Sequence, residues 1–91
     1  MKLLQGLLLH DTPDGTIAVA TGDAAKVLNG MIRLSDTAAF ILRQMETDTD
    51  EDAIVAALLS HYTGVAEDVA RKDVRDVIAR LDGVGLIDHA I

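Results

Sequence analysis

The chain has 91 residues and no cysteine, and its 15 Asp and Glu residues outnumber 8 Lys and Arg, for a formal net charge of −7. These values predict one domain over residues 1–91, stabilised by apolar packing and not by disulfides. The acidic balance argues against nucleic acid as a partner, and with Phe40 and Tyr62 as the only aromatic residues there is no stacking platform for bases. The longest apolar run near the N-terminus, residues 7–9, is too short for a signal peptide or a membrane span, so we expect a cytoplasmic protein without membrane contact.

The first third of the chain is predicted to form a β-hairpin. Residues 3–10 are rich in leucine, and residues 16–21 alternate small and β-branched side chains. Between them, Pro13 sets the first dihedral angle of a turn and Gly15 tolerates positive φ, so the chain can reverse there at little steric cost. Residues 24–28 fit either a short helical turn or a loop.

Residues 28–42, LNGMIRLSDTAAFIL, join a strand-like run directly to a helix. Met31, Ile32 and Leu34 form the apolar, β-branched run, and Ser35 is a good N-cap for a helix that continues to Met45. The dipeptide Asn29-Gly30 is a strong hairpin signal, which gives an alternative in which residues 26–28 pair with residues 31–34.

Two further helices follow. For the first, Thr49 is the predicted N-cap with Asp52 as its capping partner, and Gly64 is the predicted end. Its expected apolar stripe consists of Ile54, Ala57, Leu58 and Tyr62.

The last helix has a longer apolar stripe and ends near two glycines, Gly83 and Gly85. Leu86 and Ile87 are then expected to fold back onto the core. Three strands followed by three helices predict an α+β domain with the helices on one side of a small antiparallel sheet. The stripe of the last helix comprises Ala70, Val74, Val77, Ile78 and Leu81.

Three segments, MIRLSDTAAFIL, AIVAALLSHY and DVRDVIARLDGVGLI, make the chain resemble the PqqD family from about residue 7 to residue 87. The chain departs from the family where Ser35-Asp36 replaces the frequent Asn-Glu and where Ala38 replaces a common glycine; both changes keep the capping chemistry. The resemblance implies a winged helix-turn-helix and favours one strand over residues 30–34 rather than the hairpin alternative.

The resemblance also implies that the domain binds the leader of a ribosomally made precursor peptide, which adds as a strand beside residues 30–34 and the third helix. Main-chain groups of an open strand would then provide affinity, and side-chain pockets would provide specificity. On the helix we choose the flank with apolar residues and both charge signs over the flank of Arg71, Arg75 and Asp82. The expected peptide-binding residues are Gly30, Met31, Ile32, Arg33, Leu34, Val69, Asp73, Asp76 and Arg80.

The partners implied by the resemblance are the precursor peptide and a modifying enzyme, for which the radical S-adenosylmethionine type is a candidate. We expect no catalysis by the chain itself, because no nucleophile lies beside a general base, and we expect no cofactor and no metal site. The sequence allows a monomer or a homodimer.

Two alternatives stay open. Met31 and Ile32 alternate in direction, so at least one of them belongs to ordinary core in a purely structural interpretation, and Arg33 then only discourages edge aggregation. The functional alternative is a winged-helix transcriptional regulator or a regulatory protein-interaction module. The basic residues of the third helix are interspersed with acids, which indicates a solvated face with pairs such as Asp68 with Lys72 or Asp76 with Arg80.

Overall fold

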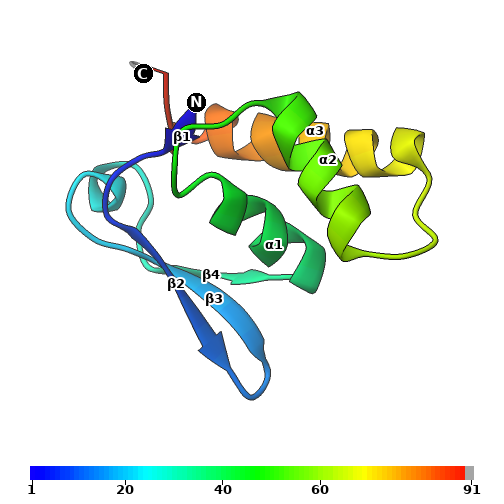
Figure 1. Ribbon diagram of the computed structural model, residues 1–91. Helices are drawn as coiled ribbons and strands as arrows, with labels where there is room; N and C mark the ends of the chain where they lie inside the picture. The colour runs from blue at the N-terminus through cyan, green and yellow to red at the C-terminus, as the bar shows by residue number, and fades with distance from the viewer. Residues whose placement is uncertain (90–91) are drawn as a thin grey trace.

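The computed structural model describes residues 1–89, so residues 90 and 91 of the predicted domain lie outside the described part. A three-stranded sheet carries the helices on one face, and α1 lies between this sheet and the pair formed by α2 and α3 (Figure 1). This arrangement confirms the α+β winged helix-turn-helix expectation. The elements in chain order are β1 (Lys2–Leu3), β2 (Leu7–Thr12), β3 (Gly15–Ala20), η1 (Ala24–Lys26), β4 (Met31–Leu34), α1 (Asp36–Gln44), α2 (Glu51–His61), α3 (Glu67–Gly83) and β5 (Ile87–Asp88).

The main sheet is antiparallel throughout, with strand order β2-β3-β4. The predicted hairpin is β2 and β3, joined by Pro13 and Asp14, and the Thr12 hydroxyl donates a 2.7 Å hydrogen bond to the Gly15 carbonyl at the turn. The register sets Ala18 between Leu9 and Ile32. Ala18 is fully buried, so the face that carries these three side chains is the face covered by the helices.

The Asn29-Gly30 hairpin alternative is wrong. Residues 24–26 form the short 3-10 helix η1, which settles the open choice there between helical turn and loop, and β4 pairs with β3 instead. Gly30 has φ +94° and introduces β4 without reversing the chain between two paired strands. The predicted Ser35 cap is confirmed, because its hydroxyl accepts a 3.1 Å hydrogen bond from the Ala38 N–H.

The predicted first strand over residues 3–10 is divided in two. Gly6, with φ +101°, separates β1 from β2. A Cβ at this position would lie 1.9 Å from the Thr21 carbonyl oxygen, so only glycine fits. The short β1 is not part of the main sheet and pairs instead with β5, through Leu3 and Ile87. The expected apolar tail therefore does return to the core, and it does so as a strand.

The predicted Thr49 cap is also wrong, because Asp50 caps α2 and accepts a 2.8 Å hydrogen bond from the Ala53 N–H. The main chain of Thr49 is already fixed by the N-terminal segment, since its N–H donates to the Met1 carbonyl at 2.8 Å. Asp52, the expected capping partner, instead bonds Arg71. α2 ends at His61, earlier than the predicted Gly64.

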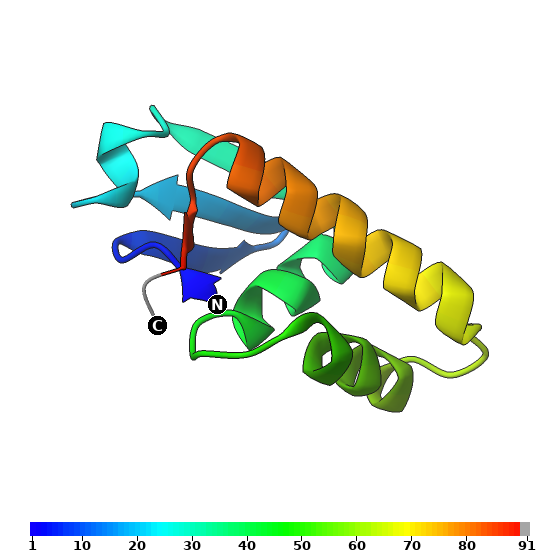
Figure 2. The ribbon, with the colours of Figure 1, turned by 90° about the horizontal axis from the view of Figure 1, so that it is seen from above.

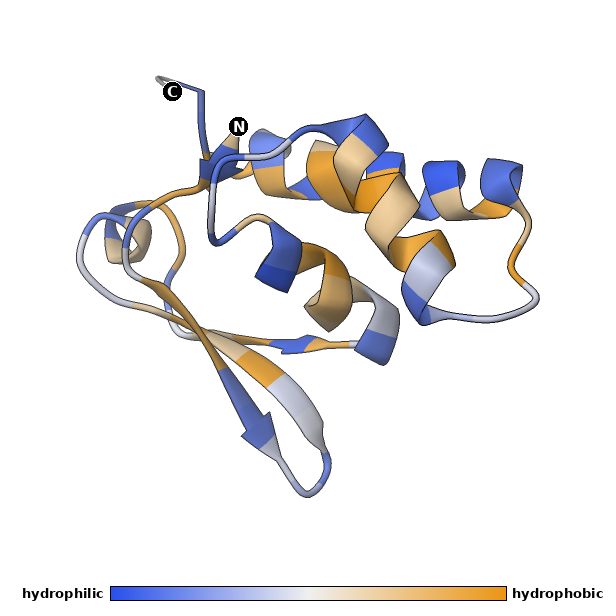
Figure 3. Cartoon of the chain, in the orientation of Figure 1, coloured by the Kyte–Doolittle hydropathy of each residue, from blue (hydrophilic) through white to orange (hydrophobic). Residues whose placement is uncertain are grey.

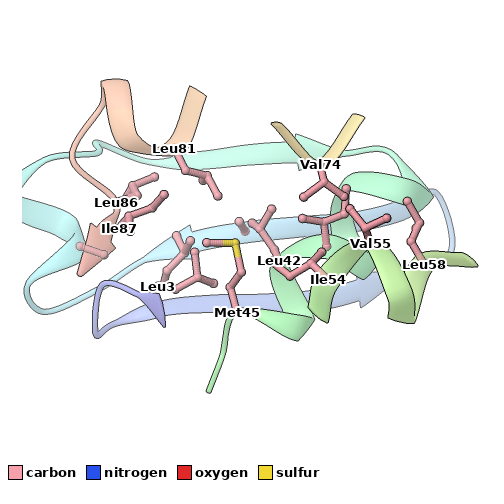
Figure 4. Close-up of a cluster of buried hydrophobic side chains, with 14 of the residues drawn as sticks. Leu3, Leu42, Met45, Ile54, Val55, Leu58, Val74, Leu81, Leu86 and Ile87 are labelled. Carbon is pink, nitrogen blue, oxygen red and sulfur yellow. The ribbon is translucent and has the colours of Figure 1, made fainter. Parts of the chain in front are cut away.

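The apolar faces of the helices meet in one core (Figures 3 and 4). The last helix follows its predicted stripe: Ala70, Val74 and Leu81 are buried, and the other two members are partly buried. Figure 4 shows Val74, Val55 and Leu58 together at one end of the cluster, and Leu3, Leu86 and Ile87 at the other end. The second helix buries Ile54 and Leu58 as predicted and adds Val55.

The two aromatic residues share one contact with a histidine at the end of α2. The Phe40 and His61 ring centroids lie 4.5 Å apart in a stacked arrangement, and Tyr62 approaches both rings edge-on. This contact fastens α1 to the end of α2. Within the described residues, no helix is long and apolar enough to cross a membrane.

Candidate functional site

A cleft of about 400 Å³ lies between β4 and the C-terminal half of α3, and we call it the β4–α3 cleft. Figure 2 shows why only half of the helix takes part: α3 passes beside β4 near its C-terminal end, while its N-terminal turns extend away together with α2. The lining is apolar except for Ser35 and two arginines. The lining residues are Leu28, Ile32, Arg33, Leu34, Ser35, Ala38, Leu42, Val77, Arg80, Leu81, Val84 and Leu86.

The strand that borders the cleft is at the edge of the sheet, since β4 pairs only with β3 in the described part of the chain. The direction of its main-chain groups follows from the hydrogen bonds at the end of the sheet, where the Ala20 N–H donates to the Gly30 carbonyl. In an antiparallel pair the residues alternate between those bonded to the partner and those directed away from it. Ile32 and Leu34 are therefore bonded toward β3, whereas Met31 and Arg33 direct their N–H and C=O groups to the open edge.

The side chains of β4 alternate in the other dimension, between the two faces of the sheet. Ile32 and Leu34 are half-buried on the helix side, at the cleft, whereas Met31 and Arg33 lie exposed on the outer face. Met31 is 67% exposed and lies opposite Val19 of β3. The edge thus combines two free donor–acceptor pairs with an apolar pocket on one side only.

The two flanks of α3 have different neighbours. Arg71 donates to Glu51 at 2.7 Å and to Asp52 at 2.9 Å, and Arg75 donates to Glu51 at 2.9 Å, so this flank faces the start of α2. These hydrogen bonds lower the pKa of the Glu51 carboxyl, with Arg75 as the largest cause and Arg71 next, and raise the pKa of Arg71. The opposite flank, which carries Val77 and Arg80, faces the cleft.

The structure brings four of the nine expected residues to the cleft. Ile32, Arg33, Leu34 and Arg80 line it. Met31 is the first residue of β4 and Gly30 directly precedes the strand, and neither lines the cleft.

The other three expected residues belong to the chosen flank but do not line the cleft. Val69 and Asp73 lie on the exposed N-terminal part of α3, and Val69 is 51% exposed. Asp76 is exposed and pairs with Lys72 at 3.4 Å, which differs from the two pairs expected for these residues. Contact of any of the nine with a peptide stays a prediction.

Sequence reasoning missed the apolar half of the lining. Val77 and Leu81 were assigned to the core stripe, and Val84 was not considered. Together with Arg80 they follow the i, i+3, i+4, i+7 spacing of one helix face. That spacing was the available signal, but it does not tell which side chains a second element covers. Among the described residues, no group of three His, Asp or Glu side chains could hold a metal ion.

The strand order, the capped helix after β4 and the open edge beside α3 define a winged helix-turn-helix domain with an uncovered strand next to an apolar cleft. The family model described as coenzyme PQQ synthesis protein D (PqqD) matches residues 11–87. The chain therefore belongs to the PqqD family. The comparison with curated protein sequences gives no match.

Two solved structures share the fold. The chain is similar to TbiB1 in complex with the TbiA(beta) leader peptide, at 18% identity and a TM-score of 0.75 over 100% of this chain and 99% of that chain. It is also similar to lasso peptide synthetase B1 complexed with the leader peptide, at 20% identity and a TM-score of 0.69 over 93% of each chain. The likeness extends over almost the full length of these chains, so the overall fold is shared.

Proposed function

We propose that the chain is a peptide-binding module that takes the leader of a ribosomally made precursor peptide as an added strand along β4 and presents it to a modifying enzyme. The main support for this proposal is the open edge of β4. There, beside the β4–α3 cleft, the main-chain groups of Met31 and Arg33 are directed away from β3. The family membership and the two similar proteins, both described as complexes with a leader peptide, support this proposal.

The physical basis is the division of work between main chain and side chains. An added strand satisfies the N–H and C=O groups of the edge whatever its sequence, and these hydrogen bonds provide affinity and direction. Alternate peptide side chains then enter the cleft, whose apolar lining favours aliphatic or aromatic residues. Nothing in this scheme requires chemistry by the module, so the modifying enzyme supplies the reaction. A radical S-adenosylmethionine enzyme is one class that fits, and the cytoplasm is the expected compartment.

The alternative of a DNA-binding winged helix is not favoured. Three of the four basic residues of α3 are engaged: Arg71 and Arg75 by Glu51 and Asp52, and Lys72 by Asp76, which leaves Arg80 alone without an ion pair among the described residues. A recognition helix needs such side chains free for phosphates and base edges. The net charge of −7 opposes the same contact.

The test is an amide-shift titration of the labelled protein with leader peptides encoded near its gene. Shifts should concentrate on residues 30–34 and on the Val77–Arg80 face of α3, and Ile32→Asp should abolish them because it places a charge in the apolar cleft. Leu8→Asp is the matched control, since Leu8 is 57% exposed on β2, at the other edge of the sheet. The proposal fails if no such leader shifts these residues while duplex DNA does.

A further inference from the structure

The two arginines that line the β4–α3 cleft, Arg33 of β4 and Arg80 of α3, are not neutralised by the many acids of this chain. Within residues 1–89, ion pairs engage Lys26, Arg43, Arg71, Lys72 and Arg75, whereas Lys2, which does not line the β4–α3 cleft, forms none. Arg33 and Arg80 likewise form no ion pair with any described carboxylate, although the chain contains 15 acidic residues. Both line the β4–α3 cleft, and among the described residues no Asp or Glu lines it.

The two arginines lie on different sides of the edge. Arg80 reaches the cleft from α3. The Arg33 side chain belongs to the outer face of the sheet, in a row with Ile17 and His10, and a second row on that face consists of Leu8, Val19 and Met31. These rows contain no carboxylate. Asp11, the acidic residue of β2, is directed to the other face of the sheet, where its carboxylate accepts hydrogen bonds from Thr16 and Arg43.

The register decides which side chains of an added strand meet each arginine. An antiparallel strand bonded to the main chain of Arg33 and Met31 places one residue directly opposite each of them, with its side chain on the outer face. The residues in between lie opposite Ile32 and, one step further, Leu34, and their side chains enter the cleft. Charged and apolar side chains are therefore expected at alternate positions of the peptide, the charged ones on the outer face and the apolar ones in the cleft.

The two arginines near the bound strand affect its preferred charge more than the net negative charge of the whole chain does. At physiological salt the screening length is about 8 Å, so the acids elsewhere on the molecule act only weakly on a strand at β4. A carboxylate directly opposite Arg33 lies at about 5 Å between Cβ atoms and is favoured over Lys or Arg there. Exposed pairs of this kind change a binding constant by about 1.4- to five-fold each.

We infer that the segment bound at β4 is an acidic strand of alternating chemistry, with apolar side chains in the cleft, a carboxylate opposite Arg33 on the outer face and a second carboxylate for Arg80 at the rim of the cleft. This inference rests on the proposed function and names the class of leader that the site selects. Arg33 and Arg80 are thereby specificity-determining residues for the peptide.

The experiment selects binders from a displayed library of random 12-residue peptides, using the wild-type protein, Arg33→Glu, Arg80→Glu and a control, Lys72→Glu. Lys72 lies on α3 outside the cleft lining, and its substitution makes the same charge change. Wild type and Lys72→Glu should enrich Asp or Glu between alternate apolar residues. Arg33→Glu should replace the acid between two cleft-facing apolar positions by Lys or Arg, and the original peptides should bind it several-fold more weakly.

Other results of the selection would refute either the inference of an acidic strand alone or the proposed function as well. Enrichment of alternating apolar residues with no acid, or with an acid unaffected by both arginine reversals, refutes this inference and leaves strand addition standing. Enrichment of no peptide whose binding depends on Ile32 refutes the inference and the proposed function together. Thermal unfolding of all variants separates loss of binding from loss of the fold, and the exposure of Arg33 and Arg80 predicts melting temperatures close to wild type.

Discussion

Replacing Arg33 by proline removes one main-chain donor from the open edge of β4. Because the Arg33 N–H is directed away from β3, the substitution leaves the β3–β4 ladder intact and should change the free energy of unfolding by less than about 1 kcal/mol. An added peptide strand, in contrast, loses one hydrogen bond, worth about 0.5–1.5 kcal/mol. The dissociation constant should therefore rise by at least about two- to twelve-fold, and further because the proline ring occupies space at the edge.

Two controls isolate the main-chain effect. Arg33→Ala removes the side chain and keeps the N–H, so the loss in Arg33→Pro is measured relative to it. Ile32→Pro removes an N–H that is directed toward β3 and should lower the urea midpoint of unfolding, in contrast to Arg33→Pro.

The assay is calorimetric titration with the leader peptide that responds in the amide-shift experiment, combined with urea unfolding of each variant. Equal affinity of Arg33→Pro and Arg33→Ala would refute the edge-pairing argument. Unfolding of Arg33→Pro at a much lower urea concentration than Arg33→Ala would refute the assigned direction of the N–H.

Two further predictions concern the fold. Gly6→Ala should lower the free energy of unfolding by about 2–5 kcal/mol, the sum of an unfavourable positive φ and a Cβ 1.9 Å from the Thr21 carbonyl oxygen. Gly64→Ala, at φ +76° in open space, should lower it by only about 1–2 kcal/mol. Equal losses for the two variants in chemical denaturation would contradict the close approach at Gly6. The lowered pKa of Glu51 contributes stability that is present above its unfolded value of about 4.3 and is lost as pH falls through the lower folded value. Thermal melts from pH 6 to pH 2 should therefore show a smaller acid loss in Glu51→Gln than in wild type, and identical losses would refute the contribution.

The sequence was sufficient for elements whose signals are local. The turn at Pro13, the Ser35 cap and the stripe of α3 each depend on residues within a few positions of one another, and all three were predicted. The pairing of Leu3 with Ile87 was not predicted. Strands of only two residues carry no periodic pattern, and these two strands come from opposite ends of the chain.

The errors at α2 and at the cleft have the same origin. Thr49 has the chemistry of an N-cap, but a main-chain bond to Met1 from far along the sequence fixes it outside the helix, and Asp50 caps instead. Similarly, the spacing of Val77 and Leu81 identifies an apolar face but not the fact that β4 leaves part of it uncovered. Local chemistry predicts what a residue can do, and tertiary contacts decide which residues do it.

The most direct test of strand addition is amide hydrogen exchange at the four residues of β4, with and without the bound leader. In the free protein the amides of Ile32 and Leu34 should exchange slowly and those of Met31 and Arg33 fast, because only the first two are directed to β3. The leader should slow Met31 and Arg33 and leave the other pair almost unchanged. Protection by the leader that appears elsewhere on the molecule, with Met31 and Arg33 still exchanging fast, would contradict the account.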